Sequence, residues 1–222
     1  MLCSPSMRLP GSTGPGSGMA DSDLAPWNAE EEPDGATPLT ADEVDGLKPS
    51  WIATRADLNT AEQENIAKGL RSRRWTRMTT DELLDDLVLR QLHRAMFGDV
   101  WTWAGQYRLT EKNLGCDPRD IAVKVRDLCA DARHWFTGTH TDADEAGCRF
   151  HRDLVAIHPF PNGNGRHSRA ATDLLMKSVG ETPFTWGSTN LMAASTVRIR
   201  YIAALHEADI GNHIPLRDFA RS

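Results

Sequence analysis

The chain has no long hydrophobic run and few cysteines. No apolar stretch among its 222 residues approaches the ~18–20 residues that cross a bilayer. The N-terminus lacks the apolar core of ~7–15 residues that marks a signal peptide. The four cysteines, Cys3, Cys116, Cys129 and Cys148, show no CxxC spacing. We therefore expect free thiols, a cytoplasmic location and no membrane partner.

An excess of positive charge is also missing. The formal net charge is −6, which argues against direct binding of nucleic acid, because phosphate binding favours a basic face. No HExxH or Cys/His pattern predicts a zinc site. Hydrophobic residues make up 40% and charged residues 25% of the chain, as in an ordinary globular domain. The length suffices for one sizeable core.

Three signals suggest where the first helices begin. Thr40 with Glu43 and Asn59 with Glu62 each have the spacing of a capping box, and Thr79 and Glu82 begin a third helix, which runs toward Phe97. The second signal predicts a helix over about 60–74. Further helices are expected near 120–136, from about 142 to 157, through Tyr201 from a cap at Ser188 or Asn190, and over about 215–220. Helical patterns dominate, so the fold class is mainly α.

One small β-hairpin is expected in this helical chain. Its strands are predicted at 107–109 and 121–123, with Lys112, Asn113 and Gly115 as turn residues between them. Residues 1–38 are rich in Gly, Ser, Pro and acidic residues, and we expect them to be disordered. A GSTGPGSG run at 11–18 precedes Met19, so either Met1 or Met19 is the true start.

The stretch HPFPNGNGRHSR, residues 158–169, contains the main chemistry of the chain. A helical pattern runs into it, and Pro159 and Pro161 prevent the helix from continuing. Gly163 and Gly165 permit a tight turn, and a second helical pattern follows. The sequence therefore predicts a helix, a glycine-rich loop and a second helix, whose N-terminus is suited to bind an anion.

Three side chains around this loop have functional chemistry. His158 stands at the loop entrance, where an imidazole can act as a general base near neutral pH. Arg166 and Arg169 are three residues apart on one face of the second helix, and guanidinium groups fit phosphate oxygens. The pattern indicates phosphoryl or nucleotidyl transfer, which depends on positioning and on stabilising charge.

The stretch resembles the Fic family motif, His-x-Phe-x-(Asp/Glu)-Gly-Asn-Gly-Arg-x-x-Arg. Every fixed position matches except Asn162, where the family usually has an acid. From about Trp51 onward the chain also resembles the branch called mobile mystery protein B. The resemblance implies a Fic-type helical domain with a β-hairpin flap and an N-terminal helical inhibitory segment. It implies transfer of AMP from ATP to a Ser, Thr or Tyr hydroxyl of a target protein.

The resemblance also implies roles for residues of the motif. His158 is the expected base, Phe160 a buried anchor, and the phosphate-binding groups are the amides of Gly163 to Gly165 with the side chains of Asn164, Arg166 and Arg169. In the family, the acid at position 162 holds Mg²⁺. Asn162 leaves three readings: a weak Mg²⁺ site with AMP transfer, another phosphate-containing donor, or loss of transfer.

A second motif lies in the predicted helix over 60–74. Thr60 to Asn65 matches (Ser/Thr)-x-x-x-Glu-(Gly/Asn), which resembles the Fic inhibitory motif, and Glu64 would then pair with Arg169. The alternatives are a solvated acidic face, or Glu64 as the base of a hydrolytic reaction that removes AMP. The hairpin with Lys112 and Asn113 would be the flap that holds the target.

We therefore expect three segments: a flexible 1–38, N-terminal helices with the inhibitory motif over 39–78, and a Fic domain over 79–222. The predicted function is that of a protein adenylyltransferase, autoinhibited by Glu64 in cis or regulated through a homodimer. Two alternatives remain, a Fic fold that binds a partner or nucleotide without turnover, and a hydrolase that removes a nucleotide from a modified protein. Tyr201 is expected either to line a nucleotide-base pocket or to pack in the core.

Overall fold

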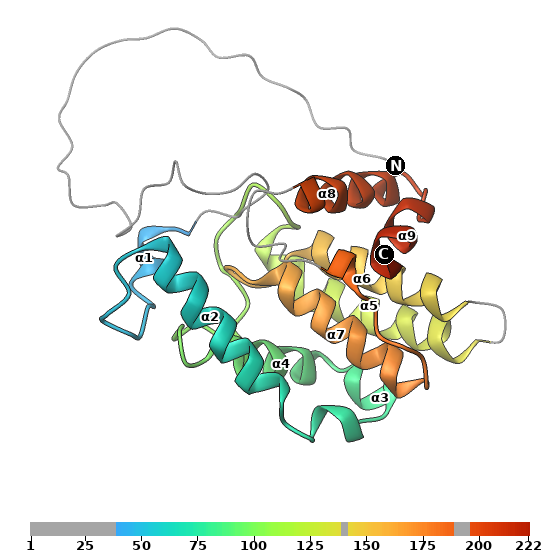
Figure 1. Ribbon diagram of the computed structural model, residues 1–222, viewed down its shortest axis with the longest axis horizontal. Helices are drawn as coiled ribbons and strands as arrows, with labels where there is room; N and C mark the ends of the chain where they lie inside the picture. Colours follow the sequence, from blue (N-terminus) through green and yellow to red (C-terminus); the bar gives the residue numbers. More distant parts are fainter. Residues whose placement is uncertain (1–38, 139–141, 189–195) are drawn as a thin grey trace, which may run out of the picture.

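The computed structural model describes residues 39–138, 142–188 and 196–222 of the chain (Figure 1). The predictions for residues 1–38 and for a cap at Asn190 lie outside these ranges. The described residues form α-helices joined by short 3₁₀ turns: α1 (Ala41–Val44), α2 (Arg55–Leu70), η2 (Trp75–Arg77), α3 (Thr80–Leu83), α4 (Asp86–Phe97), η3 (Pro118–Asp120), α5 (Ile121–Thr137), α6 (Ala143–Ile157), α7 (Asn164–Ser178), η4 (Trp186–Ser188), α8 (Thr196–Asp209) and α9 (Ile214–Arg221).

One of the two predicted capping boxes is present, since Thr40 caps α1 together with Glu43. Thr79, predicted with Glu82 to begin a helix, caps α3 together with that residue. The predicted start near Thr60 is wrong, because α2 begins at Arg55, where Thr54 and Asp57 make the capping box. The helix therefore starts more than a turn earlier than predicted.

The predicted hairpin is wrong. Within the described ranges the structure contains no strand, only one isolated bridge between Leu47 and Trp101. Ile121 to Val123, expected as the second strand, instead form the first turn of α5. Asp117 accepts a hydrogen bond from the backbone N–H of Arg119, and Pro118 begins η3, which leads directly into α5. Proline at the start of a helix is favoured because its fixed φ suits that position.

The helices pack around α6 and α7, which lie against each other at the centre (Figure 1). The main hydrophobic core joins α2, α4, α5, α6 and α7, with Phe97, Trp101 and Phe150 among its fully buried side chains. A second core, which includes Phe184, Trp186 and Phe219, attaches α8 and α9 to α6. The helices α2 and α8 thus flank the α6–α7 pair from different sides (Figure 1).

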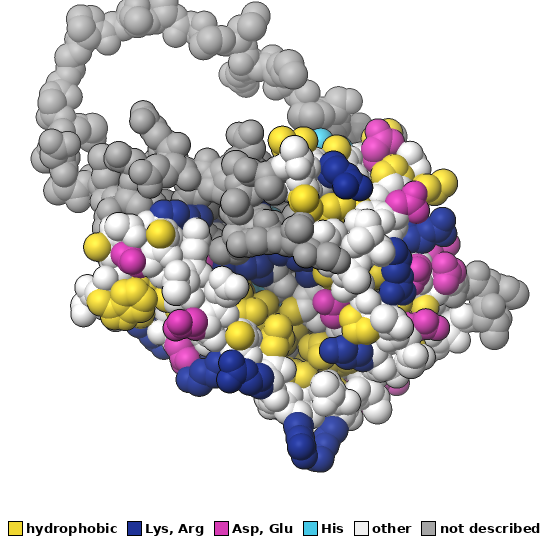
Figure 2. All heavy atoms as spheres, in the orientation of Figure 1, with side chains coloured by type: hydrophobic (Ala, Val, Ile, Leu, Met, Phe, Trp, Pro, Cys, Tyr) yellow, Lys and Arg dark blue, Asp and Glu magenta, His cyan; other side chains and the backbone are white. Residues whose placement is uncertain are grey.

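No helix in the described part of the chain is both long enough and apolar enough to span a membrane. The face drawn in Figure 2 shows hydrophobic side chains in a hollow at its centre, with Lys and Arg side chains distributed around them.

Candidate functional site

The predicted helix, loop and helix are all present around residues 158–169. Helix α6 ends at Ile157, and the next residue, His158, is left-handed with φ 54° and ψ 60°. Gly163, with φ 79°, precedes the first residue of α7. A left-handed conformation is unfavourable for a residue with a side chain but not for glycine, so the strained position in this loop is the one that carries the imidazole.

Phe160 anchors the loop, as predicted. Its side chain is 1% exposed and stacks on the ring of His93 with 3.8 Å between ring centroids. The side chain of Asn164 bonds to the backbone of Phe160, with Oδ1 accepting from the N–H at 2.9 Å and Nδ2 donating to the carbonyl at 2.8 Å. Both polar atoms of the Asn164 side chain thus hold the loop in shape, and its role as a side-chain phosphate donor stays a prediction.

His93, which the sequence did not single out, also holds this loop. It is fully buried, and its Nε2 lies 3.1 Å from the carbonyl oxygen of Asn162. Its Nδ1 accepts the N–H of Gly105 at 3.0 Å, so Nε2 carries the proton and donates. Burial holds the pKa of His93 well below its usual value. A neutral histidine thus joins the motif loop to the turn after Trp103.

The N-terminus of α7 is open to an anion. Gly163 at the N-cap has no side chain, and the structure shows no side-chain cap at this end of the helix. The backbone N–H groups of Asn164, Gly165 and Arg166 occupy the first turn, where helices leave their donors unsatisfied. These residues line a pocket of about 480 Å³.

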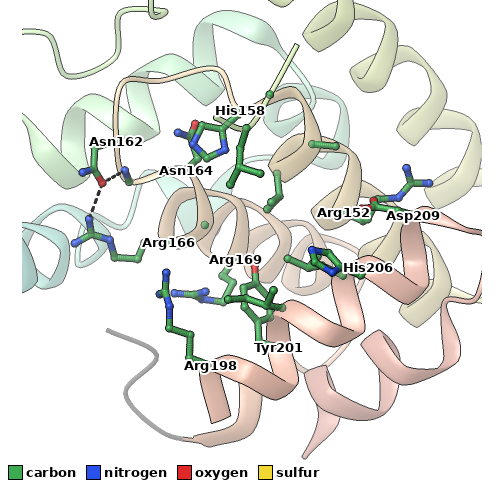
Figure 3. Close-up of a pocket in the computed structure, with 18 of the residues that line it drawn as sticks. Arg152, His158, Asn162, Asn164, Arg166, Arg169, Arg198, Tyr201, His206 and Asp209 are labelled. Atoms are coloured by element: carbon green, nitrogen blue, oxygen red, sulfur yellow. Dashed lines mark hydrogen bonds between the residues drawn. The ribbon is translucent and has the colours of Figure 1, made fainter. Parts of the chain in front are cut away.

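The pocket has walls from four parts of the chain: the segment from α6 through the motif loop to α7, helix α2, helix α8, and the loop residues Leu114 and Gly115 (Figure 3). His158, Arg166 and Arg169 of the motif face it, as predicted. The N-terminal part of α2 contributes Arg55 and Asn59, and α8 contributes a row that includes Arg198, Tyr201 and His206. The contribution of α8, except for Tyr201, was not predicted from the sequence. Helix α8 carries no recognisable motif, and its apolar residues lie partly in the second core and partly in the pocket, so they do not form one clear apolar face.

His158 lies in the pocket wall with 7% of its surface exposed. A ring nitrogen bonds to the backbone of Val155, one turn earlier in α6. Burial lowers the pKa of His158 to about 4, and the positive charges of Arg108 and Lys112 act in the same direction. The imidazole is therefore neutral at pH 7, which is the form that can accept a proton.

Arg166 is held by Glu62. Oε2 of Glu62 lies 2.6 Å from a terminal nitrogen of Arg166, and Oε1 accepts the indole N–H of Trp101 at 2.7 Å. The guanidinium of Arg166 also lies over the Phe97 ring, 4.9 Å from its centroid. Glu62 is 2% exposed. The carboxylate of Glu62, on α2, thus forms an ion pair with Arg166, the side chain that was predicted to bind phosphate.

The predicted pairing of Glu64 with Arg169 is wrong. Glu64 is exposed, and no ion pair joins it to Arg169 in the described residues. Residues two apart on a helix point about 200° apart, so the packing that buries Glu62 directs Glu64 to solvent. Arg169 is instead partly buried beside Tyr201, to which it hydrogen-bonds, with the guanidinium 5.6 Å from the ring centroid.

Tyr201 fulfils both roles considered for it, since it is buried and also lines the pocket. Its hydroxyl lies 2.9 Å from Nε2 of His151, whose Nδ1 lies 3.1 Å from the hydroxyl of Ser168. Burial lowers the pKa of His151 to about 3. These hydrogen-bonded side chains, Tyr201, His151 and Ser168, link α8 to α6 and α7 next to Arg169.

The residues at position 162 and around it do not by themselves form a metal site. The side-chain oxygen of Asn162 accepts the N–H of Gly163 at 2.5 Å and lies 3.4 Å from a nitrogen of Arg166 (Figure 3). The described residues contain no group of three or more His, Cys, Asp or Glu side chains that could hold a metal. Mg²⁺ favours charged oxygen ligands, and an amide oxygen already engaged by two N–H donors does not fit that preference.

Lys112 does not point toward a target. Its side chain is 4% exposed and forms an ion pair with Glu43 of α1, which also accepts the hydroxyl of Thr110 at 3.1 Å. The predicted role of Lys112 in target binding is therefore wrong for its side chain. Asn113, the other predicted flap residue, is exposed.

Residues 83–176 match the model of the Fic/DOC family. This segment runs from the end of α3 to the last turn of α7 and includes the whole motif. Over these residues the chain is therefore similar to the Fic/DOC family. Helices α2 and α8 also line the pocket but lie outside the matched residues.

Two curated relatives are protein adenylyltransferases by name. Protein adenylyltransferase fic-1 of Caenorhabditis briggsae is 30% identical over 142 residues, which are 62% of this chain and 26% of the relative. A probable protein adenylyltransferase of Sinorhizobium fredii, y4lH, is 33% identical over 105 residues, 44% of this chain and 55% of the relative. The chain thus spans between about a quarter and just over half the length of these relatives.

Solved Fic domains have the same fold. The N-terminal Fic domain of a putative cell filamentation protein from Bartonella quintana superposes with a TM-score of 0.62 at 16% identity, covering 80% of this chain and 90% of that one. BepC of Bartonella tribocorum, solved with bound AMPPNP, gives 0.59 at 18% identity, covering 86% and 94%.

Proposed function

We propose that this chain is a protein adenylyltransferase, which transfers AMP from ATP to a hydroxyl group of a target protein. The observation that carries the proposal is one pocket of about 480 Å³ lined by His158, the N-terminus of α7, Arg166 and Arg169. A base, an anion site and two guanidinium groups are the components that nucleotidyl transfer needs. The named activities of the relatives support this assignment.

In the proposed reaction, the hydroxyl oxygen attacks the α-phosphorus of ATP while its proton passes to the neutral imidazole of His158. The bond from the α-phosphorus to the bridging oxygen breaks, and pyrophosphate leaves with the bonding electron pair. The N–H groups at the start of α7 bind phosphate oxygens, and Arg166 and Arg169 neutralise the charge on the departing pyrophosphate. The domain thereby acts through positioning and charge, as phosphoryl-transfer sites generally do.

The resting state is restrained by Glu62 rather than by Glu64. As long as Glu62 holds Arg166, that guanidinium has a carboxylate partner and is not available to a phosphate. A nucleotide polyphosphate has to displace the Glu62 carboxylate in order to engage Arg166. This competition favours a low basal rate that rises when Glu62 is removed.

Several finer features belong to this proposal. Mg²⁺ is expected to accompany ATP, bound through the nucleotide's own phosphates, since the donors around Asn162 do not form a site. The exposed loop around Asn113 is the expected contact for a Ser, Thr or Tyr segment of the target. Assignment to the mobile mystery protein B branch, a cytoplasmic location and a possible homodimer rest on the sequence resemblance and composition.

The test is transfer of label to protein from ATP labelled at the α-phosphate, compared with ATP labelled at the γ-phosphate. We expect label from the α-position only, and none with His158→Ala. Label from the γ-position would indicate a kinase-like reaction and would refute AMP transfer.

One observation favours a second candidate, a Fic fold that binds nucleotide without turnover. Arg166 and the Asn162 oxygen bond to each other and to other protein groups, so both are occupied by protein contacts. Under this alternative the Glu62→Gln variant would bind ATP more tightly than the wild type but transfer no label, to itself or to lysate proteins.

A further inference from the structure

Three carbonyl groups at and just after the end of α6 contact one buried arginine. Arg108 is 2% exposed. Its Nε donates to the carbonyl of His158 at 2.6 Å, a terminal nitrogen lies 3.4 Å from the carbonyl of Ile157, and its backbone N–H donates to Pro159 at 2.9 Å. Three consecutive carbonyls, centred on His158, thus have the same partner.

The same side chain also closes the loop that precedes η3. Its guanidinium donates to the carbonyls of Thr110, at 2.9 Å, and of Cys116. Gly115 lies against this arrangement with φ +108°, and a Cβ there would come within 2.5 Å of a guanidinium nitrogen of Arg108 and 2.7 Å of the His158 Cβ. The loop therefore fits tightly around Arg108 and against His158.

The backbone at His158 requires such support. A left-handed conformation is unfavourable for a histidine, and the last carbonyls of a helix need partners that the helix itself does not supply. A guanidinium at a helix C-terminus meets that need and is favoured by the helix dipole. Its planar fork bonds several carbonyls in one fixed arrangement, which a lysine ammonium does not reproduce.

We propose that Arg108 is a positioning residue, which fixes the left-handed turn at His158 and thereby directs the imidazole into the pocket. Arg108 does not line the pocket, so it acts through His158 and not through the nucleotide. The claim that Arg108 directs a catalytic imidazole rests on the proposed function. The claim that Arg108 fixes the left-handed turn at His158 concerns the backbone and does not depend on that function. Because Arg108 bonds to the loop 108–116 and to the backbone of His158, a shift of that loop should also shift the imidazole.

The catalytic test compares Arg108→Lys and Arg108→Met in the Glu62→Gln background. We expect kcat to fall at least about tenfold while KM for ATP changes by less than about threefold, because the base is misplaced and the phosphate site is intact. Arg90→Met is the matched control. Arg90 donates to Gly105 and lies over the Tyr107 ring, next to the same loop, but does not touch residues 157–159, so kcat should stay within about twofold.

A second test needs no activity. His158→Gly should melt at a higher temperature than His158→Ala, because glycine relieves the left-handed strain. If Arg108 imposes that conformation, the difference in Tm should nearly vanish when both changes are made in Arg108→Met. An undiminished difference, or a folded Arg108→Lys variant with unchanged kcat, would overturn the proposal. Absence of transfer from every variant, with the Tm difference behaving as expected, would contradict only the proposed function.

Discussion

Glu62 and Arg166 form an ion pair across 104 positions of the sequence, with 2.6 Å between the carboxylate oxygen and the guanidinium nitrogen. Both side chains are largely buried. The pair connects α2, which precedes the residues that match the Fic/DOC family, to the first turn of α7, the candidate anion site. A carboxylate of α2 is therefore bonded to one of the two motif arginines.

Removing the Glu62 carboxylate should raise activity and lower stability. Glu62→Gln keeps an acceptor for Trp101 but leaves Arg166 without its charged partner, so we expect more self-labelling from ATP and a loss of about 1–3 kcal/mol in the free energy of unfolding. Glu64→Gln is the matched control, because it changes an exposed carboxylate on the same helix. Equal labelling by the two variants would show that the pair does not restrain the enzyme.

Gly163→Ala should lower the unfolding free energy and weaken ATP binding by more than the strain of its left-handed backbone alone would cause. Gly163 has φ +79°, and a Cβ there would lie 2.5 Å from the Phe97 ring, on which Arg166 rests. Gly180 has φ +84° with no atom within 4 Å of the corresponding Cβ, so Gly180→Ala measures the conformational strain without the crowding.

We expect Gly180→Ala to cost about 1–2 kcal/mol in unfolding free energy and to leave ATP binding unchanged. Gly163→Ala should cost more and should also weaken ATP binding, both measured by denaturant titration and calorimetry. Identical costs for the two variants would mean that Phe97 moves aside freely.

Asn164→Ala should loosen the motif loop. It removes both hydrogen bonds to the buried backbone of Phe160, and an unsatisfied buried polar group costs about 1–3 kcal/mol. We expect a lower free energy of unfolding and weaker ATP binding, whereas Asn113→Ala, at an exposed position, should leave both unchanged. Retained stability in Asn164→Ala would refute the loop-shaping role.

The protein should become less stable as the pH falls from 7 toward 4. Burial lowers the pKa of His158 and His167 to about 4 and of His151 to about 3, and it also depresses that of His93. In the unfolded chain histidines titrate near ~6.5, so below that pH the unfolded state binds protons that the folded state does not. One such histidine lowers the unfolding free energy by about 2 kcal/mol between pH 7 and pH 5.

Two aspartates act in the opposite direction over part of this range. Burial raises the pKa of Asp173 to about 6 and also raises that of Asp153, so the folded state holds protons there that the unfolded state releases. The four histidines outnumber them, and the net slope should follow the histidines. Urea titrations at pH 7 and 5 measure it, and His167→Gln, which can keep the bond to the Leu89 carbonyl, should reduce the slope. Stability that is constant or higher at pH 5 would contradict the burial of neutral imidazoles.

The sequence predicted the motif region well because its signals are local. Pro159, Pro161, Gly163 and the flanking helical patterns determine a helix, loop and helix through backbone preferences alone, and the structure has that arrangement. The burial of Phe160 followed from the family resemblance. His158, Arg166 and Arg169 all face the pocket as expected.

The errors concern contacts between distant segments. A capping box at Asn59 and one at Thr54 are both plausible from the local sequence, and the helix begins at the second. Glu62 and Glu64 lie on the same helix, and it is the contacts of Glu62 with Trp101 and Arg166 that make Glu62 the buried acid. The turn residues Lys112 and Asn113 suggested a hairpin, but the loop is shaped by Arg108, whose partners are mainly carbonyls that carry no sequence signal.

The most direct test of the account is the intact mass of the Glu62→Gln protein after incubation with ATP and Mg²⁺. The account predicts an added mass of one AMP per modified site, present in Glu62→Gln, weaker in the wild type and absent in Glu62→Gln combined with His158→Ala. An AMP adduct that persists without His158, or no adduct on Glu62→Gln or on any lysate protein although ATP binds, would contradict it.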